Sequence, residues 1–310
     1  MASFCALFSC AIFTVMVLMT TEINCTSTTT TPAATTPTPS VDMIFIADTG
    51  HKEILAATMG RYRFSSLIRE DIEVWDVLFS EANQKLYYAK KHDGHIYESN
   101  ADGSGVRQVS SKSHTEPTSL SIDEINQEIY VAYKGGELIS SFNLNGTRIR
   151  ETRVHKQLSK PGAIYVDAEN GYLYFTQFAG VWRSSLSGKD LIPLHHDSDL
   201  GEIEAIAVDV QGERIVISDP GNGKVVSMHI NGTRAVSPGN PPAVEMVDLS
   251  SPYKITDVQF FNGDLYVSNE RENRAIMKLA NGNGLPKKIY TDTRDILSYP
   301  RKFHIAKVNV

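Results

Sequence analysis

The sequence predicts an all-β protein: a single six-bladed β-propeller of four-stranded blades. A short apolar phrase returns six times, and successive copies lie 42 to 50 residues apart. The copies are residues 44–48, 86–90, 129–133, 173–177, 215–219 and 265–269. A turn glycine repeats at nearly the same interval, at Gly60, Gly103, Gly146, Gly188, Gly232 and Gly282. A period of about 40–50 residues built from short β-strands is typical of propeller blades.

Each unit divides into four strands. The first carries alternating apolar residues after a proline, as at Pro117, Leu120 and Ile122. The second is the repeated phrase, whose nearly continuous apolar character is expected where neighbouring blades cover both faces of a strand. The third is a short apolar segment such as residues 181–183, and a more polar outer strand follows the glycine turn.

The two ends of the repeat array predict how the ring closes. The first unit has no strand one, because Met43 opens directly into the repeated phrase. After the sixth unit, Pro300, Phe303 and Ile305 repeat the spacing of a strand one. We therefore expect the C-terminal strand to complete the N-terminal blade and close the ring. Closure removes the open sheet edges that otherwise invite aggregation.

The N-terminal region differs in composition from the repeats. Residues 2–19 are almost continuously apolar, as in a secretory signal peptide, and are short for a spanning helix of about 20 residues. We expect a signal peptide at 1–25, a Thr/Pro-rich disordered linker at 26–41 and the propeller at 42–310. The three cysteines, Cys5, Cys10 and Cys25, all precede the propeller, which must be held by its own core.

Composition excludes several functions. The net charge of −6 and pI near 5.9 provide no basic face for nucleic acid. Nucleophile, phosphate-loop and zinc-binding motifs are absent from the sequence, so we expect no catalytic residue, cofactor or metal. The sequence therefore predicts a secreted, extracellular, monomeric binding protein that leaves the membrane when its signal is cleaved. Asn145 and Asn231, each in an Asn-Gly-Thr-Arg turn, are the expected glycosylation sites.

The repeated phrase resembles the class B repeat of the low-density lipoprotein receptor family, which is known by a Tyr-Trp-Thr-Asp motif. The match is best over residues 85–110, with Leu86-Tyr87-Tyr88-Ala89 followed by Ala101-Asp102-Gly103-Ser104. Asp48 and Asp219 keep the aspartate of the motif, whereas no copy contains its tryptophan. The resemblance covers about residues 42–308 and implies a scaffold that binds extracellular proteins.

Antiparallel strands sort the loops of such a propeller onto two faces. Face one carries the loops between strands two and three and the connections between blades, and face two carries the remaining turns, including both glycosylation sites. We expect a protein ligand on face one, where residues 193–203 and 237–253 are expected as long loops. The candidate contacts at the ends of strand two are His92, Tyr133, Phe178, Asn222, Glu270 and Arg271.

Two other functions stay open. A small ligand in the central channel requires an apolar or aromatic funnel with one counter-charge. A calcium-dependent hydrolase, similar to lactonase propellers, requires several converging oxygen ligands. Asp76, Glu204 and Asp257 near the starts of inner strands are the candidate ligands for such a cation, and Lys302 on a nearby inner strand opposes it.

Overall fold

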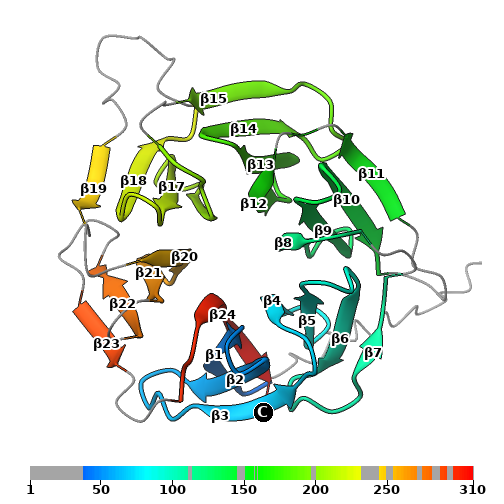
Figure 1. Cartoon of the computed structure of the whole chain (residues 1–310), viewed down its shortest axis with the longest axis vertical. Helices are drawn as coiled ribbons and strands as arrows, with labels where there is room; N and C mark the ends of the chain where they lie inside the picture. Colours follow the sequence, from blue (N-terminus) through cyan, green and yellow to red (C-terminus); the bar gives the residue numbers. More distant parts are fainter. Residues whose placement is uncertain are drawn as a thin grey trace, which may run out of the picture. The chain divides into compact units, whose positions relative to one another are not determined.

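The six repeated phrases form the second strands of six four-stranded antiparallel sheets, which surround a central channel (Figure 1). This computed structural model describes residues 38–110, 114–144, 151–156, 158, 160–196, 200–231, 244–248, 254–270, 274–280, 287–291 and 296–309. The predicted all-β propeller is confirmed. The signal peptide and all but the last residues of the linker lie outside the described residues. Within the described ranges, the structure has no helix of the length and apolar character needed to cross a membrane.

The blades are named here from one to six in ring order, each from its inner to its outer strand. Blade 1 contains β24 (Pro300–Asn309), β1 (Ser40–Asp48), β2 (Glu53–Thr58) and β3 (Ser65–Arg69). Blade 2 contains β4 (Val74–Ser80), β5 (Lys85–Lys90), β6 (Ile96–Asn100) and β7 (Arg107–Gln108). Blade 3 contains β8 (Pro117–Asp123), β9 (Glu128–Tyr133), β10 (Leu138–Asn143) and β11 (Glu151–Lys156).

The second half of the ring repeats the arrangement. Blade 4 contains β12 (Pro161–Asp167), β13 (Tyr172–Gln177), β14 (Gly180–Ser185) and β15 (Ile192–His196). Blade 5 contains β16 (Ala205–Asp209), β17 (Arg214–Asp219), β18 (Lys224–His229) and β19 (Val244–Asp248). Blade 6 contains β20 (Ile255–Phe261), β21 (Asp264–Asn269), β22 (Ala275–Leu279) and β23 (Lys287–Thr291).

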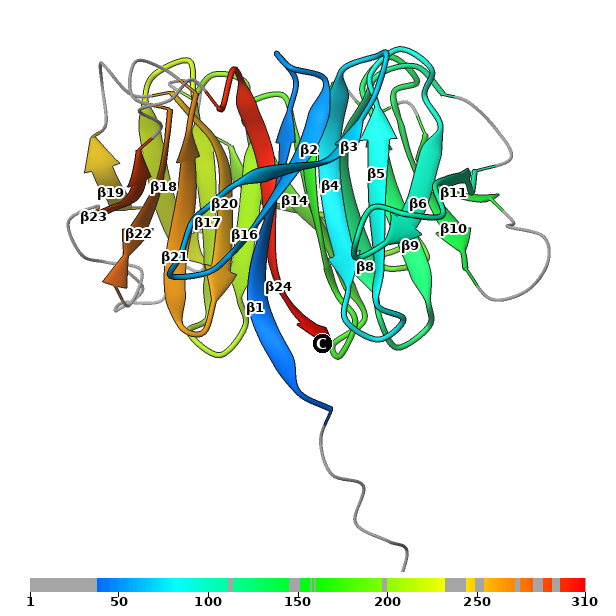
Figure 2. The ribbon, with the colours of Figure 1, turned by 90° about the horizontal axis from the view of Figure 1, so that it is seen from below.

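The C-terminal strand closes the ring as expected. β24 pairs antiparallel with β1 along the whole length of β1 and forms the inner strand of blade 1 (Figure 2). Met43 stands opposite Ala306, and Ile46 stands opposite Phe303. β1 begins at Ser40, two residues before the expected start of the propeller, because Ser40 and Val41 continue this pairing.

Among the described residues, the hydrophobic core forms six buried clusters, one between each pair of neighbouring blades. Alternate residues of each second strand point into different clusters. In β1, Phe45 and Ala47 pack towards blade 2, whereas Ile44 and Ile46 pack towards blade 6. This two-sided burial explains why the repeated phrase is apolar at nearly every position.

The structure corrects the two segments expected as long loops on face one. Residues 193–203 include most of β15, and residues 237–253 contain β19, so each segment supplies the outer strand of its blade. Outer strands lack the alternation that identifies the inner ones, because only one edge and part of one face are covered. β15 shows this directly, since Leu194 is buried while Ile192 is exposed.

The glycine turns owe their regularity to backbone conformation. Gly60, Gly103 and Gly188 have φ angles of 81°, 80° and 81°. This left-handed region is disfavoured for residues with a Cβ atom, so glycine recurs there. The equivalent Gly146, Gly232 and Gly282 lie outside the described residues.

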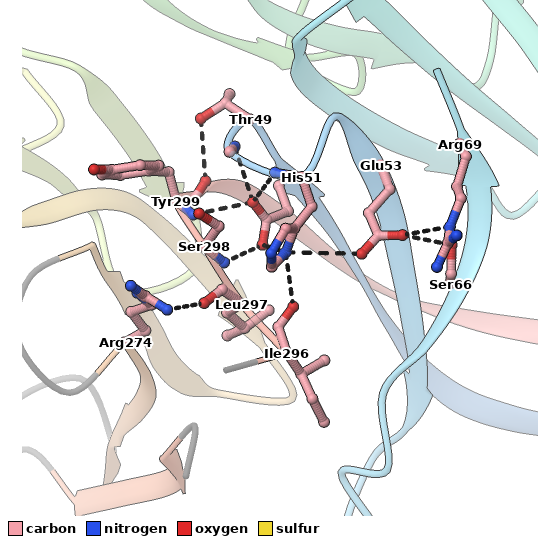
Figure 3. A network of polar contacts seen from close by, with 12 residues as sticks. Thr49, His51, Glu53, Ser66, Arg69, Arg274, Ile296, Leu297, Ser298 and Tyr299 are labelled. Carbon is pink, nitrogen blue, oxygen red and sulfur yellow. Dashed lines mark hydrogen bonds and ion pairs between the residues drawn. The ribbon is translucent and has the colours of Figure 1, made fainter. Parts of the chain in front are cut away.

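A polar network fastens the closure on face one, which is the upper face in Figure 2. The buried carboxylate of Asp48 accepts hydrogen bonds from the backbone N–H groups of Gly50 and His51 at 3.0 and 3.2 Å. It also accepts from Ser298 at 2.6 Å and Tyr299 at 3.0 Å, both just ahead of β24. Thr49 and His51 add contacts to the carbonyl oxygens of Tyr299 and Ile296 (Figure 3).

Candidate functional site

The central channel holds a cavity of about 290 Å³ that is lined by all six inner strands. Strand register places one side chain from each inner strand at the same level, beside the fourth residue of the repeated phrase. We call this the charged level, and its members are Asp76, Ser119, Ala163, Ala205, Asp257 and Lys302. Blades 6, 1 and 2 therefore supply the charges, and blades 3, 4 and 5 supply small side chains.

Part of the charged level joins neighbouring blades. Asp76 Oδ2 accepts the backbone N–H of Leu120 at 2.7 Å, and Ser119 Oγ accepts that of Ile164 at 3.2 Å. Asp257 Oδ2 accepts the N–H of Phe303 at 2.9 Å. In each case the side chain of one inner strand bonds the free edge of the next. These residues therefore stabilise the ring whatever else they bind.

The charges at this level are unequally compensated. Lys302 Nζ lies 3.2 Å from Asp257 Oδ1 and donates to the carbonyl oxygen of Glu204 at 2.6 Å. Asp76, by contrast, accepts hydrogen bonds from the backbone N–H groups of Val77 and Leu120. Burial raises the pKa of Asp76 to about 7, although the more distant Lys302 ammonium lowers it and Asp257 raises it further. Burial also raises the pKa of Asp257.

Two titratable side chains line the cavity one level deeper. His304 on β24 is partly buried, and its desolvation lowers its pKa to about 4. Tyr165 on β12 is partly buried, and this desolvation raises the pKa of its phenol to about 12. Near neutral pH the imidazole and the phenol are both uncharged, so the charge in the channel resides at the level above them.

The predicted calcium ligands do not assemble into a cation site. Lys302 contacts the carboxylate of Asp257, and Glu204 forms an ion pair with Arg301 at 3.2 Å. No group of three His, Cys, Asp or Glu side chains is placed to hold a metal ion in the part of the chain that the structure describes. The lysine that was expected to oppose a cation is therefore in contact with one of the three candidate carboxylates.

A second hollow, of about 280 Å³, lies at the face-one mouth of the channel. It is lined by residues immediately before the charged level, including Trp75, Glu204 and Arg301. The guanidinium of Arg301 lies 4.0 Å from the Trp75 ring, and the Lys91 ammonium lies 4.5 Å from it. The indole is thus held by two cation–π contacts. We call this hollow the mouth pocket.

The mouth pocket contains buried polar atoms that make no hydrogen bond among the described residues. They are Trp75 Nε1, Arg301 Nε and Glu204 Oε2. The last is paired in charge with Arg301 Nη2 but lacks hydrogen-bond geometry. Buried polar groups in proteins are nearly always hydrogen-bonded, and each exception costs about 1–3 kcal/mol.

The predicted contact residues differ in how far they are exposed to solvent. Phe178 is 60% exposed, and His92 and Asn222 are also exposed. Glu270 is half-buried and pairs with Lys254 at 3.0 Å. Tyr133 is completely buried between blades 2 and 3, so its ring offers no surface on face one. Arg271 lies outside the described residues, as does the glycosylation site Asn145, whereas Asn231 is exposed.

Sequence reasoning missed Trp75 and Arg301. Each directly precedes a member of the charged level in the sequence. This position next to a channel residue was the signal that could have identified them. Their meeting depends on ring closure, because β4 and β24 lie near opposite ends of the chain and adjoin only when blade 1 is complete. Neither the period nor the alternation of the repeat reveals such a contact.

The fold and the channel define a six-bladed propeller with a polar mouth, and no family model matches the chain. Among solved structures, a chain of the nidogen/laminin complex superposes with a TM-score of 0.71 at 15% identity, over 86% of this chain and 98% of that one. Virginiamycin B lyase from Staphylococcus aureus has a TM-score of 0.58 at 16% identity, over 81% of each chain. At these identities the likeness concerns the fold, and at that level the resemblance to class B propellers is confirmed.

Proposed function

We propose that this protein is a secreted, non-enzymatic binding scaffold that docks an extracellular protein on face one, over the mouth pocket. The unsatisfied polar atoms of Trp75, Glu204 and Arg301 carry the proposal. A partner that inserts a polar group there would satisfy two donors and one acceptor that otherwise lack hydrogen bonds. Trp and Arg are also the residue types most enriched at the energetic centres of protein interfaces.

A second observation on the same face supports the proposal. Phe178 connects β13 to β14 with a φ angle of 53° and keeps 60% of its surface exposed. The positive φ is the conformation that a two-residue hairpin loop between Gln177 and Gly180 requires, so the exposure of the ring is the feature that supports a contact. Exposed aromatic rings of this kind are enriched at protein interfaces.

The similar solved structures include a chain of a protein–protein complex and a lyase, so catalysis is the competing class of function. Two contacts favour binding. Asp257 and Glu204, two of the three carboxylates available for metal-assisted chemistry, are each paired with a cation of β24. These pairs occupy acceptor positions that a catalytic cation would need.

Photo-crosslinking tests the proposal before the partner has been identified. A crosslinking amino acid is placed at Phe178 on face one or at the exposed Glu169 on face two, and the full chain is incubated with extracellular fluid and with purified laminin as a named probe. We expect one protein to be labelled from position 178 and not from 169. Equal labelling from both positions would overturn face-one docking.

The affinity of the labelled partner then tests the mouth pocket. Trp75→Phe removes the Nε1 donor and keeps an aromatic ring, and we expect at least about tenfold weaker binding, which is about 1.4 kcal/mol. Trp182→Phe is the matched control, since Trp182 packs on the core between blades 3 and 4 and does not line the mouth pocket. Equal affinities of the two variants would exclude the mouth pocket from the interface.

A further inference from the structure

The cavity below the mouth pocket has the layout of a site for a small amphipathic ligand. Its charged wall is formed by Asp76, Asp257 and Lys302, and its opposite wall includes Ala163 and Ala207. The volume of about 290 Å³ is close to the lower bound of about 300 Å³ for small-molecule pockets. A ligand of this site is therefore small, with a polar group at one end and a short apolar body.

Charge compensation identifies the polar group. Two carboxylates and one ammonium meet at the charged level, which leaves one carboxylate in excess when all three are ionised. Lys302 donates its hydrogen bonds to Asp257 and to the Glu204 carbonyl, whereas Asp76 accepts from backbone N–H groups. A second cation is thus accommodated beside Asp76 with overall neutrality.

We propose that the channel binds a small organic amine, whose ammonium pairs with Asp76 and whose apolar body lies against the alanine wall of blades 4 and 5. The site differs from the mouth pocket and does not depend on protein docking at face one. Ile206 and Val208 of β16 also line the cavity, and their side chains pack into the core between blades 4 and 5. A divalent metal ion suits this layout poorly, because the Lys302 ammonium already contacts the Asp257 carboxylate at 3.2 Å.

The other titratable groups around Asp76 are either paired with one another or uncharged. The ammonium of Lys302 and the carboxylate of Asp257 form the neighbouring pair, and Arg301 and Glu204 pair above them. His304 and Tyr165 below are uncharged because burial shifts their pKa values away from neutrality. Asp76, whose pKa is about 7, is therefore the group that an ammonium competes for with a proton.

Calorimetric titration of the full chain with phenethylamine and with 2-phenylethanol, its neutral counterpart of similar shape, tests the proposal. We expect the amine to bind at least about tenfold more tightly than the alcohol, and its affinity to fall about tenfold from about pH 8 to about pH 6. The measured heat should depend on the buffer, because binding displaces a proton from Asp76. Equal binding of the two probes, no binding of the amine at about 1 mM, or a pH-independent affinity would each overturn the proposal.

A pair of variants locates the bound amine. Asp76→Asn should weaken amine binding at least about tenfold, since it removes the paired charge. Asp167→Asn is the matched control, because it removes the same charge from a buried carboxylate at the C-terminal end of β12, away from the charged level. The Asp167 carboxylate accepts the N–H of Asn170, and its replacement should leave the affinity for the amine unchanged. If Asp76→Asn does not fold, the pH series on the unaltered chain still decides. Undiminished binding by a folded Asp76→Asn would refute the site.

Discussion

At the residue scale, the motif aspartate fastens the connection between blades. Asp48 accepts four backbone N–H groups, two of which belong to the segment that leads into β24. Asp219 similarly accepts the N–H of Gly201 at 2.8 Å, and Asn269 accepts that of Lys254 at 2.8 Å. The fifth position of the phrase therefore has a structural role in these three blades. Its polar side chain accepts backbone hydrogen bonds from the segment that leads into the inner strand of the same blade.

Asp48→Ala should lower the free energy of unfolding by about 3 kcal/mol, because it leaves buried N–H groups without an acceptor. Urea titration measures this loss. The exposed Glu169→Ala is the control and should change stability by no more than about 0.5 kcal/mol. A loss at Asp48 no larger than that of the control would show that the network is not stabilising.

At the element scale, β24 carries two roles. It completes blade 1 by pairing with β1. Its side chains also place Arg301 at the mouth pocket and Lys302 at the charged level. Phe303 and Ile305 of the same strand enter the core between blades 6 and 1. Ring closure and site assembly are thus one event, since the strand cannot pair with β1 without placing these cations.

Phe303→Ala tests the contribution of this strand. Phe303 is 3% exposed, so its truncation should cost about 3–5 kcal/mol of unfolding free energy. Tyr299→Ala, just ahead of the strand, removes a ring that is 53% exposed and should cost about 0.5 kcal/mol or less. Equal losses in chemical denaturation would mean that β24 contributes no specific packing to the closure.

At the scale of the whole molecule, two titratable groups of the channel oppose each other in their pH dependence. The folded-state pKa of Asp76 is raised from 3.8 to about 7, so its contribution to stability falls as pH rises through this window. The folded-state pKa of His304 is lowered from 6.5 to about 4, so its contribution falls as pH decreases through that window. The two slopes nearly cancel where the windows overlap.

Single variants should reveal each slope. Asp76→Asn removes a contribution that falls with pH. Between about pH 4.5 and about pH 6, the slope of its unfolding free energy against pH should therefore be more positive than that of the unaltered chain, by up to about 1.4 kcal/mol per pH unit. His304→Gln should make it fall with pH by a similar amount. Urea titrations at several pH values measure both, and relative slopes of the same sign would contradict the assignment.

The sequence alone was sufficient for the repeat, the blade number and the ring closure. These follow from local patterns: two-sided burial makes each second strand apolar, and left-handed turns select glycine at Gly60, Gly103 and Gly188. The outer strands were misplaced at β15 and β19, because strands covered on one side leave a weak pattern. Tyr133 was predicted as a surface contact, since its place at the end of a strand does not reveal its burial between two blades.

The sequence by itself thus determined the architecture of this protein, because the same pattern of buried positions recurs in the sequence of every blade. Only the tertiary structure decided the site. Closure of the ring brings Lys302 to Asp257 and Arg301 to Trp75 across blade boundaries. Such contacts depend on which blades become neighbours and on side chains that differ from one blade to the next, so no periodic pattern records them.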